Sequence, residues 1–151
     1  METIKNYIGG ELVAPLSGEY IDNYSPVTGE VYSKVPDSGE EDVELAARAA
    51  KKAFPIWSKM SVQERADKLF KLADLIEKNA EMLAIAESKD QGKPLWLAQK
   101  VDIPRGHQNL RFFAHAVMNQ KSIAFTDTEG VSEYINRSPI GPCALISPWN
   151  L

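Results

Sequence analysis

The chain has 151 residues, of which 44% are hydrophobic and 25% charged, a composition typical of a soluble globular protein. Its net charge of −4, with acids and bases interspersed, argues against a nucleic-acid or membrane-surface partner. No apolar run is long enough to span a membrane, and the N-terminus lacks the apolar segment of a signal peptide. The single cysteine, Cys143, cannot form an intrachain disulfide, so we expect a cytoplasmic protein.

The first 36 residues have the pattern of β-strands. Residues 6–13 alternate around Gly9-Gly10, and residues 19–36 form two β-rich runs joined at Pro26–Gly29. Glycine and proline at these joins favour tight turns, so the pattern predicts short strands connected as hairpins.

Helices are predicted between residues 38 and 119. Ser38 with Glu41, and Ser61 with Glu64, have the spacing of capping boxes at the start of two helices. The first helix is expected to stop at Pro55. The second presents an apolar stripe at helical spacing, made of Ala66, Leu69, Phe70, Ala73 and Ile76.

Two further helices are expected to follow. The first begins after Asn79 and ends at Gly92, a typical C-cap residue. Pro94 suits the first turn of the next helix. Pro104 and Gly106 are expected to kink or break that helix before the run NLRFFAHAVMN resumes it.

After Gln120 the pattern returns to a period of two. It predicts a long hairpin that turns near Thr128–Gly130. Residues 140–147, IGPCALIS, form the nearly continuous apolar run of a parallel strand buried on both faces. No parallel partner for this strand is predicted in the sequence, and a strand without neighbours leaves backbone groups unpaired. We therefore expect the chain to be the start of a larger α/β fold.

Several segments together resemble one enzyme family. The closing SPIGPCALISPWN is similar to the signature of NAD(P)-dependent aldehyde dehydrogenases, in which a strand ends in Pro-Trp-Asn. The segments YIGGELV, NYSPVTGEVYSKVP, AARAAKKAFPIWSKMSVQERADKL and ESKDQGKP occur in the family's order. The stretch AESKDQGKPLWLAQKVDIPRG followed by NLRFFA most resembles the branch that includes 2-aminomuconate and 2-hydroxymuconate semialdehyde dehydrogenases.

This resemblance implies an α/β fold in three parts. Residues 1–120 would form the N-terminal strands and helices of the cofactor-binding domain, and residues 121–138 an oligomerisation-type β-hairpin. Residues 139–151 would form the first strand of a Rossmann-like NAD(P)-binding sheet, truncated in this chain. The full-length enzyme is expected to be a homo-oligomer, a dimer or tetramer, that oxidises an aldehyde to a carboxylic acid, with a carboxylate-bearing semialdehyde as one substrate class.

The resemblance also assigns roles near the end of the chain. Asn150 would donate a hydrogen bond to the oxyanion that forms when a cysteine thiolate attacks the aldehyde. An asparagine suits this role because its amide does not titrate and so donates at any working pH. Alternatively, Asn150 caps the next helix. The residues that would border the nicotinamide of NAD, or of NADP, are Ile146, Ser147, Pro148, Trp149 and Asn150. Alternatively, Trp149 is core. Cys143 is expected to be structural, so the chain lacks the family's catalytic cysteine and is expected to be inactive alone.

Two further sites are implied by the family. The arginine of Asp-Ile-Pro-Arg, Arg105, would bind the substrate carboxylate through its planar guanidinium; the alternative is a solvated or salt-bridged arginine. Asp102, with the backbone carbonyls near Asn23 and Tyr24, would hold a monovalent cation; the alternative is a helix-surface aspartate. A competing hypothesis for the whole chain is a non-catalytic, truncated gene product that acts as an interaction module.

Overall fold

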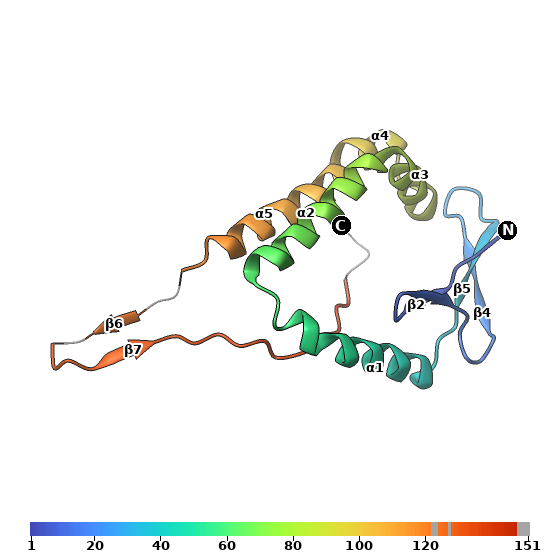
Figure 1. Cartoon of the computed structure of the whole chain (residues 1–151). Coiled ribbons are helices and arrows are strands. Elements are labelled where there is room, and N and C mark those ends of the chain that lie inside the picture. The colour runs from blue at the N-terminus through green and yellow to red at the C-terminus, as the bar shows by residue number, and fades with distance from the viewer. Residues whose placement is uncertain (122–123, 127, 148–151) are drawn as a thin grey trace.

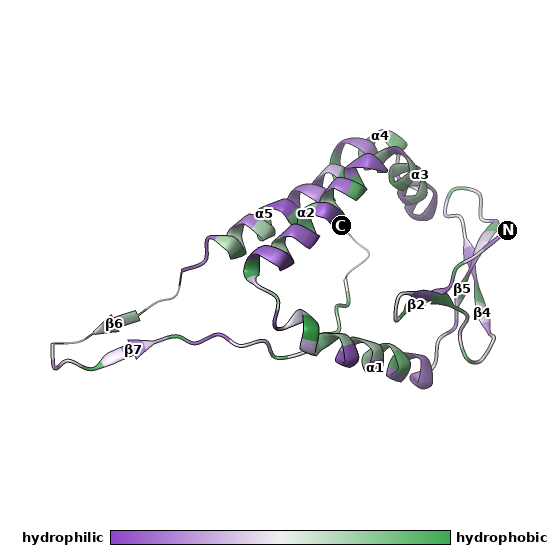
Figure 2. Ribbon diagram, viewed as in Figure 1, coloured by the Kyte–Doolittle hydropathy of each residue, from purple (hydrophilic) through white to green (hydrophobic). Residues whose placement is uncertain are grey.

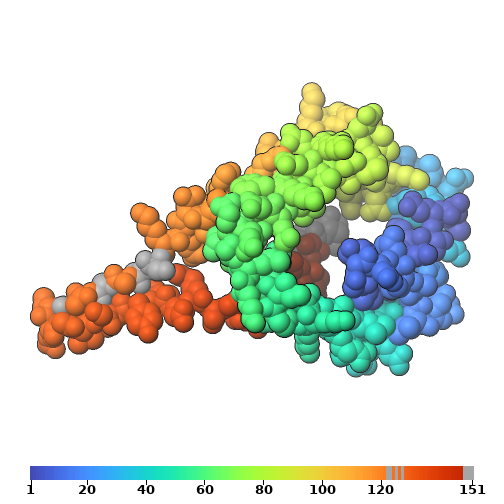
Figure 3. Space-filling model, in the orientation of Figure 1, coloured from blue at the N-terminus to red at the C-terminus, as the bar shows by residue number. Residues whose placement is uncertain are grey.

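The computed structural model describes residues 1–121, 124–126 and 128–147. It is a mixed α/β arrangement, as the sequence predicted. Small sheets lie at the N-terminal end, α1 forms one side, and α2 lies beside α5 on the opposite side (Figure 1). The hairpin of β6 and β7 projects away from the rest of the chain (Figures 1 and 3).

The N-terminal strands confirm the predicted hairpins. The short strands β2 and β3 are antiparallel, and Gly9 and Gly10 between them have positive φ angles of 63° and 95°. The longer strands β4 and β5 are also antiparallel and are joined through Gly29, whose φ is 71°. One strand was not predicted: β1 pairs in parallel with β5. The bounds are β1 Glu2–Thr3, β2 Asn6–Ile8, β3 Glu11–Val13, β4 Tyr20–Tyr24 and β5 Val31–Pro36.

Helix α1 spans Glu40–Trp57, and two predictions about its ends are wrong. The capping residues are not Ser38 and Glu41: the helix is capped at Gly39, whose amide donates a 3.0 Å hydrogen bond to the Asp42 carboxylate. Ser38 instead hydrogen-bonds to Asn6, at 2.8 Å, and so ties α1 to β2. Pro55 does not stop the helix, because a proline in the last turn removes only one hydrogen bond there.

Helices α2, Val62–Lys78, and α3, Ala80–Gln91, begin where predicted, and α3 also ends where predicted. The hydroxyl of Ser61 accepts a hydrogen bond from the amide of Glu64, at 3.2 Å, and the Glu64 carboxylate accepts one from the amide of Ser61, at 2.7 Å. Helix α3 ends at Gly92, whose φ of 70° is the left-handed conformation of a glycine cap.

Pro104 was predicted to kink or break the next helix; the structure shows no break but an irregular turn directly before the proline. Helix α4, Leu95–Leu97, continues through a π-helical turn, η1, over Ala98–Asp102, into α5, Ile103–Met118. Within this turn the amide of Ile103 donates to the carbonyl of Ala98, five residues back. The wider turn accommodates the proline ring and its missing N–H, so the helix passes through without ending.

Helices α2 and α5 pack through small side chains. The predicted stripe on α2 is confirmed, since Ala66 and Ala73 are fully buried and Leu69, Phe70 and Ile76 are half-buried. Ala114 of α5 is also fully buried, and the centroids of the Phe70 and His115 rings lie 4.8 Å apart. Figure 2 shows that hydrophobic and hydrophilic residues alternate around both helices. Within the described residues, the buried hydrophobic side chains are all alanines: Ala66, Ala73, Ala84, Ala98 and Ala114.

The C-terminal part contains the predicted hairpin but not the predicted strand. Strands β6, Ala124–Thr126, and β7, Ser132–Tyr134, are antiparallel, and the turn between them contains Gly130, with φ 85°. Residues 139–147 form no strand, and Leu145 is 90% exposed. The described chain offers no strand edge beside this segment, and a strand forms only where its backbone groups find partners. No helix in the described part of the chain could span a membrane.

Candidate functional site

The predicted oxyanion and nicotinamide residues lie at the end of the segment that follows the hairpin. Ile146 and Ser147 are exposed, Ile146 at 95%. Pro148, Trp149 and Asn150 lie outside the described residues. The roles of all five residues therefore stay predictions.

The start of the same segment lies against α1. An apolar groove of about 420 Å³ lies between them, with Phe54 and Trp57 on one side and Pro139 and Ile140 on the other. A neighbouring groove of about 390 Å³ is lined by Ala47 and Lys51 of α1 and by residues 142–144. Cys143 is exposed, so its predicted burial in a strand is not seen in this structure.

Arg105 lies in the first turn of α5 and is exposed. It forms no hydrogen bond or ion pair with any residue in the described ranges. Arg111, further along the same helix, is held instead by Asp74 at 2.6 Å and by Glu77 at 2.7 Å. The ion pairs of Arg111 therefore connect α5 to α2, whereas the guanidinium of Arg105 is available to bind an anion.

Asp102 closes the π-helical turn, and its carboxylate is paired. Its Oδ2 accepts a 2.8 Å hydrogen bond from Nζ of Lys93, which also contacts Oε1 of Glu87 at 2.9 Å. The exposed fractions of the Lys93, Asp102 and Glu87 side chains are 17%, 16% and 34%. The hydrogen bond that Lys93 donates to Asp102, and then the one that it donates to Glu87, raise the pKa of Lys93 above its usual value. Lys93 thus stays charged at neutral pH.

Asn23 and Tyr24, the other predicted cation ligands, lie at the irregular end of β4. The Asn23 side-chain amide donates to Tyr32, Ser33 and Asp90, at 2.9, 3.2 and 3.2 Å. The hydroxyl of Tyr32 donates to Asp90 as well, and this bond raises the pKa of Tyr32. The described residues contain no group of three or more His, Cys, Asp and Glu side chains able to hold a metal ion. A cation bound by carbonyl oxygens and Asp102 stays a prediction.

The end of α3 and the loop that follows it contain two charged residues that connect separate elements. Asp90 connects the end of α3 to β4 and β5, and Lys93 connects the start of the next helix to the π-helical turn. A sequence signal was present, since these two charged residues flank the Gly92 cap. By itself, this local pattern indicates only that a helix ends there.

The described fold is a mixed α/β arrangement, and comparison with known proteins identifies the family. A model of the aldehyde dehydrogenase family matches residues 13–151, and the chain belongs to this family. The resemblance inferred from the sequence is therefore confirmed.

Individual relatives agree with this assignment. The chain is 51% identical over 149 residues to 2-aminomuconic semialdehyde dehydrogenase of Bos taurus, covering 98% of this chain and 30% of that protein. It is 43% identical over 146 residues to aldehyde dehydrogenase B of Escherichia coli (strain K12), covering 96% of this chain and 28% of that protein. It is also similar to an aldehyde dehydrogenase from Bacillus cereus solved as an NAD+ complex, with a TM-score of 0.82, 35% identity, and coverage of 87% of this chain and 27% of that chain. The chain thus spans about 30% of the length of its curated relatives.

Proposed function

We propose that the full-length protein containing this chain oxidises an aldehyde to a carboxylic acid with NAD+ or NADP+. The observation that carries this proposal is the family match over residues 13–151, which includes the Pro148-Trp149-Asn150 motif. The likeness to a Bacillus cereus enzyme solved with NAD+ supports the cofactor class. The bound cofactor would supply the acceptor for the hydride that leaves the substrate.

In this proposal the chain's own residues orient the reacting groups. The Asn150 side chain donates to the oxyanion, and Ile146, Ser147, Pro148 and Trp149 border the nicotinamide. The exposure of Ile146 and Ser147 fits a segment that other groups cover in the complete enzyme. An asparagine suits the first role because its amide donates a hydrogen bond at any working pH.

We further propose a carboxylate-bearing semialdehyde as the substrate class. The supporting observations are the 51% identity to a 2-aminomuconic semialdehyde dehydrogenase and the absence of an acidic partner for Arg105 among the described residues. A guanidinium can bind a carboxylate through two parallel hydrogen bonds, and it stays charged at any physiological pH.

The test compares two aldehydes of similar size in the full-length protein. Arg105→Met should weaken kcat/KM for succinic semialdehyde by about tenfold to a hundredfold, the value of a hydrogen bond to a charged group. The value for pentanal should change little. NADH formation is measured for both substrates. Arg48→Met, which removes an exposed arginine paired with Glu44 on α1, is the matched control. Equal losses for both substrates would make Arg105 structural and remove the proposed substrate class.

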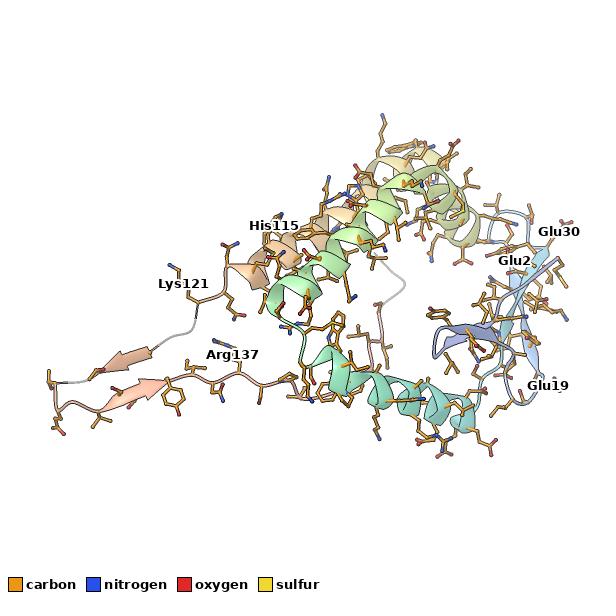
Figure 4. All side chains as sticks on the ribbon, in the orientation of Figure 1. Glu2, Glu19, Glu30, His115, Lys121 and Arg137 are labelled. Atoms are coloured by element: carbon orange, nitrogen blue, oxygen red, sulfur yellow. The ribbon has the colours of Figure 1, made fainter. Side chains whose placement is uncertain are left out.

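The projecting hairpin supports a proposal about how the full-length protein, which we propose to be cytoplasmic, assembles into oligomers. Figure 4 shows Lys121 and Arg137 on the two arms at the base of this projection. Tyr134 on β7 is 78% exposed. We propose that residues 121–138 contact another subunit in a homodimer or homotetramer. Shortening the hairpin between residues 124 and 134 should lower the mass of the full-length protein in analytical ultracentrifugation, and an unchanged mass would exclude this role.

A further inference from the structure

The spacing of Asp102 and Arg105 places an acid beside the proposed substrate arginine. Residues three apart on a helix lie on the same face, and an aspartate and an arginine at this spacing attract each other. Asp102 is the only acidic residue within four positions of Arg105 in either direction. An ion pair between them would occupy the guanidinium that the proposed function requires to be available.

That ion pair is not formed, and Lys93 supplies the reason. Its Nζ lies 2.8 Å from Oδ2 of Asp102, on the side of the helix that faces the α3–α4 loop. Both side chains are mostly buried, so this contact is screened less by water than the exposed pair of Lys34 and Asp22, whose atoms lie 3.6 Å apart. The Asp102 carboxylate is thus engaged by Lys93 and not by Arg105.

Two other groups face Lys93 or its loop. Glu87 of α3 contacts the same Nζ at 2.9 Å, so the lysine balances two carboxylates. Asp90 is directed away from this cluster, because it accepts hydrogen bonds from Asn23 and Tyr32. Lys93 is therefore the cation that holds Asp102 in place, and the loop position that carries it is fixed to the sheet through Asp90.

We propose that Lys93 is a positioning residue for substrate recognition: by pairing with Asp102, it keeps the guanidinium of Arg105 free for a carboxylate on the substrate. Lys93 itself does not touch the substrate. This inference rests on the proposed function, because it assumes that Arg105 binds the substrate carboxylate.

The experiment uses the full-length protein and the same two aldehydes. Lys93→Met leaves Asp102 unpaired, so Asp102 should compete for Arg105. KM for succinic semialdehyde should then rise about twofold to fivefold, the scale of one ion pair of this kind, while kcat and the KM for pentanal change little. Adding Asp102→Asn to Lys93→Met removes the competitor and should restore the lower KM. Lys93→Arg, which keeps the charge, should behave like the wild type.

Further variants keep the test decisive. Lys34→Met is the matched control, since it removes a lysine paired with an aspartate on the sheet. Melting temperatures are measured for every variant, and Lys93→Gln, which keeps a hydrogen-bond donor without the charge, replaces Lys93→Met if that variant does not fold. An equal rise of KM for both aldehydes, or a double variant with no recovery, would overturn the inference. If Arg105→Met weakens activity only towards succinic semialdehyde but the Lys93 variants do not, this inference fails and the proposed substrate class stands. If Arg105→Met weakens activity towards both aldehydes equally, the proposed substrate class fails as well.

Discussion

Arg105 and Arg111 lie on the same helix, and their surroundings give them different tasks. Arg111 has two carboxylates within hydrogen-bond distance, contributed by α2. Arg105 has no such partner in the described structure, although Asp102 lies one turn before it. The sequence left open whether Arg105 is solvated, salt-bridged or used in binding. The structure argues against the salt bridge, because Asp102, the acidic residue nearest to Arg105 in the sequence, is paired with Lys93.

Asn150 is the residue whose replacement should affect chemistry most directly. Asn150→Ala in the full-length protein should lower kcat by about 10²–10³-fold, the usual cost of losing one oxyanion donor. Affinity for the cofactor should change little, because the lost hydrogen bond forms with the substrate oxygen. Single-turnover measurement of hydride transfer checks this. A wild-type rate in the variant would leave Asn150 with only a capping role.

At the scale of elements, two glycines, one at the end of α3 and one inside α5, have opposite requirements. Gly92 has a φ of 70°, and a Cβ built on it would lie 2.8 Å from Cγ of Pro26 in the β4–β5 turn. Gly106 lies inside α5, with nothing within 4 Å of an added Cβ. The same substitution should therefore destabilise the protein at one position and stabilise it at the other.

Gly92→Ala should lower the free energy of unfolding by about 1 kcal/mol or more, because alanine is strained in the left-handed conformation and its methyl group meets Pro26. Gly106→Ala is the matched control and should raise it by up to about 1 kcal/mol, the difference in helix propensity. Urea unfolding followed by circular dichroism measures both. A neutral Gly92→Ala would show that the end of α3 is not packed against the turn as the structure has it.

At the scale of the whole molecule, the described part of the 151-residue chain buries few large apolar side chains. The completely buried apolar side chains in the described part are alanines, whereas Ile140 and Ile146, on the segment that follows the hairpin, are 92% and 95% exposed. Figure 3 shows this segment partly covered by α1 and the hairpin extending beyond the rest of the surface. Such exposed apolar surface favours association with other chains.

The 151-residue chain, produced alone, should not oxidise aldehydes and should aggregate as its concentration rises. It should show helical circular dichroism from α1 to α5 and should bind hydrophobic dyes. Deleting residues 121–151 should reduce both aggregation and dye binding while keeping most of the helical signal. Light scattering and dye fluorescence measure these effects. A monomeric chain that melts sharply and binds no dye would instead favour the interaction-module hypothesis.

The helices and N-terminal hairpins could be predicted from the sequence because short-range interactions determine them. The Ser61–Glu64 capping box, the Gly92 cap and the turn at Gly29 each depend on atoms a few residues apart. The family could be inferred for a related reason, since its signature segments occur in order along the chain.

Other features depend on contacts between residues distant in sequence, and only the tertiary structure decided them. Asp42, in the first turn of α1, accepts a hydrogen bond from the amide of Leu16 in the N-terminal part of the chain, which no local pattern encodes. The sequence predicted a kink or a break at Pro104, and the structure shows that the helix continues through a π-helical turn. The pairing of Lys93 with Asp102 required the α3–α4 loop to fold back onto that turn. Residues 139–147 show the same dependence: their sequence favours a strand, but a strand forms only when another supplies its hydrogen bonds.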